Sequence, residues 1–99
     1  MTPASKGAPS PALAALREEL AALDAEFVQL LARRVQLARR VGAEKRAAGL
    51  PTLDPRREAH VVAAVARYAR REGLPEESVR DIFWPVVSMC RRVQQEEAS

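Results

Sequence analysis

The stretch from Ala12 to about Ala48 constrains the fold more than any other segment, because it contains no proline and a single glycine, Gly42. Alanine, leucine, arginine and glutamate dominate it, and all four favour helix. Its apolar residues recur in alternating steps of four and three positions: Leu16, Leu20, Leu23, Phe27, Leu30, Leu37 and Val41. The stretch therefore predicts one long helix with an apolar stripe.

The length of this helix bears on the assembly. About 37 residues at about 1.5 Å each give a helix of roughly 55 Å. A compact domain of 99 residues has a radius of gyration of about 13 Å, so it is only about 30 Å across. Because one chain cannot cover such a helix, we predict an intertwined homodimer in which the long helices of two copies pack side by side.

A second helix follows a short loop. Gly49 and Pro51 end the long helix. Asp54 is the expected N-cap of the next helix, with Pro55 at its first position, and the helix is predicted to run to about Glu72.

A third helix is predicted to open at residues 74–77, where two glutamates occupy the first turn. Pro85 lies inside it and is expected to kink the helix or to shift its start. One side of this helix is apolar, and it carries Val79, Ile82, Phe83, Val86, Val87, Cys90 and Val93. The fold class predicted from these patterns is all-α, a three-helix protomer over residues 12–99, with a flexible tail over residues 1–11.

Composition excludes several classes of protein. The 13 acidic residues are scattered among 16 basic ones, so the net charge of +3 does not favour nucleic-acid binding. No apolar run is long enough for a membrane span, and the N-terminus lacks the apolar core of a secretory signal. The single cysteine, Cys90, permits no internal disulfide. These features predict a cytoplasmic protein that binds neither membrane nor nucleic acid.

Three polar residues interrupt the apolar stripes. Arg34 continues the four-three rhythm from Leu30, and Lys45, three turns further on, points nearly the same way. A buried cation needs an anion, which here is either a ligand or an internal ion-pair partner, unless the side chain snorkels to solvent. Gln94 lies on the apolar side of the third helix, where it is either hydrogen-bonded in the interior or exposed at a frayed helix end.

The start of the second helix adds Arg57 and Glu58, and Glu58 aligns with the apolar side of that helix. His60 has no second ligand at metal spacing, and Cys90 has no histidine at a spacing that suggests nucleophilic catalysis. We therefore predict a surface histidine and a small core cysteine, with no metal site. No glycine-rich phosphate loop appears. The remaining groups suit an anion whose charge develops during reaction.

The ordered set of motifs resembles the all-helical chorismate mutase family over about residues 13–95. It consists of Leu16-Arg17, Leu23-Asp24, Leu30 to Arg34, Val41-Gly42, Lys45, Leu50 to Glu58, Gly73 to Pro75, Ile82-Phe83 and Gln94.

The resemblance implies an isomerase of aromatic amino acid biosynthesis (the shikimate pathway) that rearranges chorismate to prephenate without a cofactor. It also implies an interlocked dimer whose two sites are shared between chains. Arg17 from the partner chain and Arg34 would hold the carboxylates of the dianionic substrate, and Lys45 and Gln94 would donate to its ether oxygen.

The same resemblance implies roles for the second helix. Arg57 would orient the carboxylate side, and Glu58 with the backbone at Asp54 would contact the ring hydroxyl. Cys90 stands where the family often has serine near a carboxylate.

Several alternatives remain open. A 4-amino-4-deoxychorismate mutase would use Glu58 against an ammonium, and isochorismate pyruvate lyases share the fold, although residues 54–58 look more like a mutase. A non-catalytic helical module and a mutase that depends on an activating partner enzyme are the others.

Overall fold

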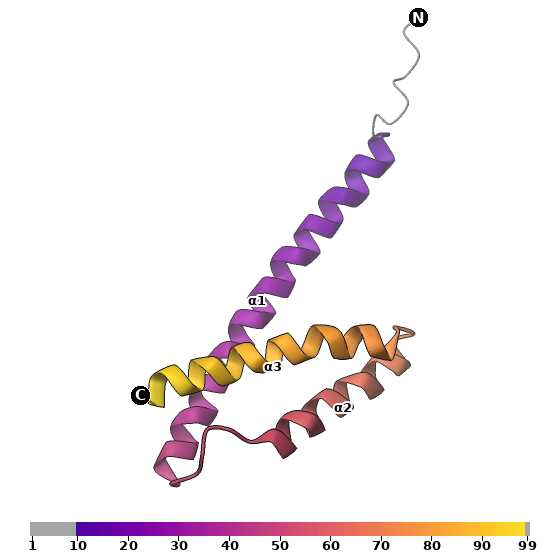
Figure 1. Cartoon of the computed structure of the whole chain (residues 1–99). Helices are drawn as coiled ribbons and strands as arrows, with labels where there is room; N and C mark the ends of the chain where they lie inside the picture. The colour runs from indigo at the N-terminus through magenta and orange to yellow at the C-terminus, as the bar shows by residue number, and fades with distance from the viewer. Residues whose placement is uncertain (1–9, 99) are drawn as a thin grey trace, which may run out of the picture. The chain divides into compact units, whose positions relative to one another are not determined.

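The computed structural model describes residues 10–98, which form three α-helices and no strand (Figure 1). The helices are α1 (Pro11–Ala47), α2 (Pro55–Arg71) and α3 (Glu76–Ala98). The prediction of an all-α, three-helix protomer is confirmed. Contacts divide the chain into two units, one that ends at Leu31 and one that begins at Ala32, so α1 contributes to both. Most of the predicted tail, residues 1–9, lies outside the described residues.

The N-terminal end of α1 lies one residue earlier than predicted. Ser10 caps the helix, since its Oγ accepts a hydrogen bond from the backbone N–H of Leu13 at 3.0 Å. Pro11 occupies the first helical position, where its missing N–H is no loss. Residue 11 therefore belongs to the helix and not to the tail.

In the first unit, α1 carries its apolar stripe uncovered. Five large apolar side chains of the stripe are each 53–59% exposed, and these are Leu16, Leu20, Leu23, Phe27 and Leu30. An isolated helix gains most of its stability in proteins from burying such a face, not from helix propensity alone. The protomer by itself does not supply that burial.

The second unit has its core between α2 and α3, which lie side by side (Figure 1). Its buried apolar residues are small or medium in size, which lets the helices approach closely, and they are Ala38, Val62, Ala66, Ala69, Val86, Val87 and Cys90. None of the large apolar side chains among the described residues is fully buried. The core of one protomer is therefore thin.

Glycine and aspartate set the turns as the sequence predicts. Gly49 and Gly73 have φ values of 70° and 71°, in the left-handed region that suits glycine after a helix end. Asp54 caps α2, because its Oδ1 accepts the backbone N–H of Arg57 at 3.1 Å. An ion pair between Arg70 and Glu76 spans the turn that joins α2 to α3.

Of the two effects expected of Pro85, a shift in the start of α3 does not occur, and a kink in the helix stays a prediction. The helix begins at Glu76 and continues through Pro85 to Ala98. The proline ring is exposed, and one missing backbone hydrogen bond does not end a helix whose other side packs against α2. Within residues 10–98, no helix combines the length and apolar character needed to cross a bilayer.

The tight packing of α2 against α3 generates a prediction. Ala66→Leu should lower the free energy of unfolding by about 1–3 kcal/mol, because Ala66 is buried and the extra carbon atoms have no space. Urea denaturation followed by circular dichroism measures it. Ala63→Leu is the matched control, since Ala63 is exposed on the same helix and should change the value by less than about 0.5 kcal/mol. Equal effects of the two substitutions would contradict the packing described here.

Candidate active site

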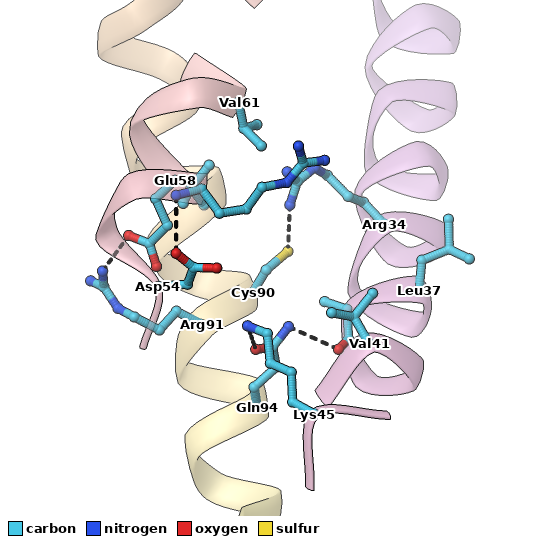
Figure 2. Close-up of a pocket in the computed structure, with 13 residues that line it drawn as sticks. Arg34, Leu37, Val41, Lys45, Asp54, Glu58, Val61, Cys90, Arg91 and Gln94 are labelled. Carbon is cyan, nitrogen blue, oxygen red and sulfur yellow. Dashed lines mark hydrogen bonds and ion pairs between the residues drawn. The ribbon is translucent and has the colours of Figure 1, made fainter. Parts of the chain in front are cut away.

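The second unit contains an open pocket of about 310 Å³, a size that suits a small metabolite (Figure 2). Its walls come from the end of α1, the start of α2 and the C-terminal part of α3. The lining residues are Arg34, Leu37, Ala38, Val41, Lys45, Asp54, Arg57, Glu58, Val61, Val87, Cys90, Arg91 and Gln94. Seven of the eight residues predicted for the site therefore line one pocket. The eighth, Arg17, is an exposed residue of the first unit.

Arg34 reaches into the pocket from α1 and meets Cys90 of α3 (Figure 2). Its Nη1 donates a hydrogen bond to Cys90 Sγ at 2.9 Å. Neither Arg34 nor Lys45 takes part in an ion pair among the described residues, so the predicted alternative of an internal ion pair is not realised in the protomer. A guanidinium has five N–H donors, and most of those of Arg34 remain for an anion.

Lys45 and Gln94, in the lower part of Figure 2, are hydrogen-bonded to each other in the pocket wall. Lys45 Nζ donates to Gln94 Oε1 at 3.1 Å and to the carbonyl oxygen of Thr52 at 2.9 Å. Gln94 Nε2 donates to the carbonyl oxygen of Ala38 at 3.0 Å. An ammonium has three donors and a carboxamide two, so these contacts leave one N–H on each nitrogen for a ligand.

Gln94 is only 7% exposed, so the alternative of a solvent-facing residue at a frayed helix end is wrong. Gly42 makes this burial feasible. A Cβ at position 42 would lie 3.0 Å from Gln94 Cγ, closer than side chains normally pack. Gly42, the one glycine of α1, therefore marks the place where the side chain of Gln94 meets that helix.

The charges of the pocket favour an anionic ligand. Four cationic side chains line it, against the carboxylates of Asp54 and Glu58. One carboxylate oxygen of Asp54 is already engaged as the cap of α2, and Glu58 is paired with Arg91. The remaining cations, Arg34, Lys45 and Arg57, have no carboxylate partner among the described residues.

Sequence reasoning missed Arg91. Its Nη1 donates to Glu58 Oε1 at 2.6 Å, and its Nη2 lies 3.5 Å from Ser88 Oγ. The signal was present, because Arg91 lies four residues after Val87 and three before Gln94, on the face that those residues share. Taken alone, a cation in an arginine-rich helix end looks like an ordinary solvated residue.

The structure also tests the predictions made for His60 and Cys90. His60 is exposed, as predicted. Within the part of the chain that the structure describes, no group of His, Cys, Asp and Glu side chains is arranged to hold a metal ion. Cys90 is buried, as predicted for a core residue, and it also lines the pocket.

Comparison with known proteins identifies the fold family. Residues 16–95 match the chorismate mutase type II family, a range that covers all of α2, most of α1 and α3, and every pocket residue described above. The chain belongs to the chorismate mutase type II family. The prediction made from the ordered motifs is thereby confirmed, and with it the assignment to a family of isomerases.

Three relatives illustrate the range of this chorismate mutase family. The T-protein of Enterobacter agglomerans is 34% identical over 84 residues, which are 85% of this chain and 21% of that protein. A 4-amino-4-deoxychorismate mutase of Streptomyces pristinaespiralis is 32% identical over 99 aligned positions, covering 95% of this chain and 77% of the relative. A 4-amino-4-deoxychorismate mutase of Streptomyces venezuelae is 35% identical over 77 residues, which cover 77% of this chain and 75% of that protein. The chain thus spans about a fifth of the T-protein.

The contact between Gly42 and Gln94 predicts that Gly42→Ala has opposite effects on stability in the wild-type protein and in the Gln94→Ala variant. Gly42→Ala should lower the free energy of unfolding by about 1 kcal/mol or more, because Gln94 is bonded at both ends of its amide and cannot yield. In a protein that also carries Gln94→Ala, Cγ is absent and the close contact is lost. There, Gly42→Ala should raise the free energy of unfolding by up to about 1 kcal/mol, because alanine favours helix more than glycine does. Chemical denaturation of the four proteins measures both values. The same sign in both backgrounds would contradict the close contact.

Proposed function

We propose that this chain is a chorismate mutase that converts chorismate into prephenate. The observation that carries the proposal is the pair Lys45 and Gln94, which are hydrogen-bonded to each other and each retain one N–H donor beside the guanidinium groups of Arg34 and Arg57. Chorismate is a dianion whose ether oxygen gains negative charge as its bond to carbon breaks. The pocket offers cations for the carboxylates and neutral and cationic donors for that oxygen.

Arg34 and Arg57 bind the substrate carboxylates in this proposal. A guanidinium presents paired N–H donors that match a carboxylate in a bidentate manner. Arg34 is held in place by the sulfur of Cys90, which does not neutralise its charge. Binding both ends of the substrate selects the compact, chair-like conformer, and this selection removes part of the activation barrier.

Lys45 and Gln94 act on the transition state. Each donates its remaining N–H to the ether oxygen, and the interaction strengthens as that oxygen becomes negative. The hydrogen bonds to Thr52 and Ala38 fix both nitrogen atoms beforehand, so little reorganisation is needed. The rearrangement breaks one carbon–oxygen bond and forms one carbon–carbon bond within the same molecule, so no covalent intermediate and no proton transfer are required.

Glu58 and the backbone at Asp54 contact the ring hydroxyl in this arrangement, and both residues line the pocket. Cys90 borders the carboxylate side together with Arg34. A thiol is a weaker hydrogen-bond donor than a hydroxyl, so the arginine carries that interaction. The single buried thiol also fits a reducing cytoplasm as the place where the enzyme works.

The functional unit in this proposal is an intertwined homodimer. The exposed stripe of α1 needs a cover, and a second copy of the same helix offers a matching stripe. Arg17 lies within this stretch of α1, next to Leu16. It enters the partner's pocket and completes the carboxylate site there.

A second candidate is a 4-amino-4-deoxychorismate mutase. The observation in its favour is that the two Streptomyces relatives of that name match over about three quarters of their own length. Glu58 is the residue on which this alternative depends, because it would face an ammonium in place of a hydroxyl. An activating partner enzyme is a further proposal, prompted by the much greater length of the T-protein.

The proposed role of Lys45 is tested by following the ultraviolet absorbance of chorismate as it is consumed. The wild-type protein should consume it and form prephenate. Lys45→Ala should lower kcat by at least about a hundredfold, about 3 kcal/mol, because a preorganised donor to the ether oxygen is lost. Arg46→Ala is the matched control, since Arg46 is the next residue, is exposed and does not line the pocket. A wild-type protein that consumes neither chorismate nor its amino analogue would favour a non-catalytic or partner-dependent module.

The shared site is tested by mixing two inactive variants. Arg17→Ala and Lys45→Ala should each be inactive alone. When equal amounts are unfolded and refolded together, half of the dimers combine both chains, and one of their two sites is then intact, so about a quarter of the wild-type activity should return. A mixture that stays as inactive as the separate variants would contradict the contribution of Arg17 from the partner.

A further inference from the structure

Arg91 forms an ion pair with Glu58 in the pocket wall, and unlike Glu58 it has no role in the steps described above. Arg91 comes from α3 and Glu58 from the first turn of α2, and Figure 2 shows the Glu58 carboxylate turned toward Arg91. The distance between Arg91 Nη1 and Glu58 Oε1 is 2.6 Å. Both residues also line a second hollow with Trp84, Pro85, Ser88 and Arg92, so the pair lies between the two spaces.

The pair is partly withdrawn from water. The side chain of Glu58 is 15% exposed and that of Arg91 is 30% exposed. Solvent therefore screens their charges less than it screens a surface pair. A ligand group that meets Glu58 consequently meets a carboxylate whose charge is largely balanced, with a guanidinium directly behind it.

This balance matters for the substrate. A neutral hydroxyl donates a hydrogen bond to a carboxylate oxygen, and Arg91 does not oppose it. Oε2 of Glu58 has no donor among the described residues, so it is available for this bond. An ammonium in the same position would gain from Glu58 but would be repelled by the cation of Arg91 a few ångströms further on.

We propose that Arg91 is a positioning residue that sets the substrate preference of the site. It holds the Glu58 carboxylate in place and offsets its charge, so that the pocket accepts a ring hydroxyl and disfavours a ring ammonium. This inference rests on the proposed function and chooses between its two candidate substrates. The arginine acts through Glu58 and does not itself touch the substrate.

The test measures kcat/KM for chorismate and for 4-amino-4-deoxychorismate with the wild-type protein and with Arg91→Gln. The wild type should prefer chorismate. Glutamine retains a hydrogen-bond donor for Glu58 and removes the charge, so the ratio of the two kcat/KM values should move at least about tenfold toward the amino compound. Most of the change should appear as a lower KM for that compound, because an ammonium is attracted in the ground state as well as in the transition state.

Two further variants separate charge from structure. Arg91→Lys retains the cation and should keep the wild-type ratio within about threefold, even if activity with both substrates falls. Arg92→Gln removes the same charge from the next residue, which is exposed and lines the second hollow but not the substrate pocket, and should leave the ratio unchanged. Each ratio is internal to one protein preparation, so a partly unfolded variant still reports its preference.

The outcomes are distinct. A wild-type preference for the amino compound would overturn the inference. It would also favour the second candidate function, the 4-amino-4-deoxychorismate mutase. A clear preference for chorismate that Arg91→Gln does not alter would overturn the role of Arg91 and leave the proposed function standing. A wild-type protein without activity on either compound would overturn the proposed function and this inference with it.

Discussion

The carboxamide of Gln94 is buried against the one glycine of α1, and the geometry of the pocket depends on how this polar group is satisfied. A buried amide that loses its partners destabilises a protein by about 1–3 kcal/mol, so both ends of the group must find one. Its nitrogen meets the carbonyl oxygen of Ala38 and its oxygen meets Lys45. These two bonds fix α3 against the end of α1, and the space left beside them is the pocket.

Two arginines of this pocket differ in what holds them, and the difference gives them different uses. The guanidinium of Arg34 rests on the sulfur of Cys90, an uncharged and weak acceptor, and therefore keeps its full charge for a ligand. The guanidinium of Arg91 is committed to Glu58 and is largely neutralised. The first attracts an anion, whereas the second adjusts the charge of another side chain. Residue type alone does not distinguish these roles.

Local patterns in the sequence were sufficient for the three helices and for their ends, because caps, glycines and apolar periodicity act over a few residues. Arg34 and Lys45 were also recognisable, since each is a cation on an apolar stripe of a single helix. The pairing of Arg91 with Glu58 and the burial of Gln94 were not decidable, because they depend on the distance between segments about 30 to 50 residues apart. The sequence also left open whether Pro85 would shift the start of α3, and the helix begins at Glu76.

The acceptors that hold the two central donors are main-chain atoms. Lys45 is held by the carbonyl oxygen of Thr52, and Gln94 by that of Ala38. Every residue supplies a carbonyl, so the side chain at position 52 can be exchanged during evolution without loss of the acceptor, whereas the buried position 38 also needs a small side chain. The positions of the two donors therefore tolerate many substitutions in the loop around Thr52, as long as Gly42, a small residue at position 38 and the course of that loop are kept.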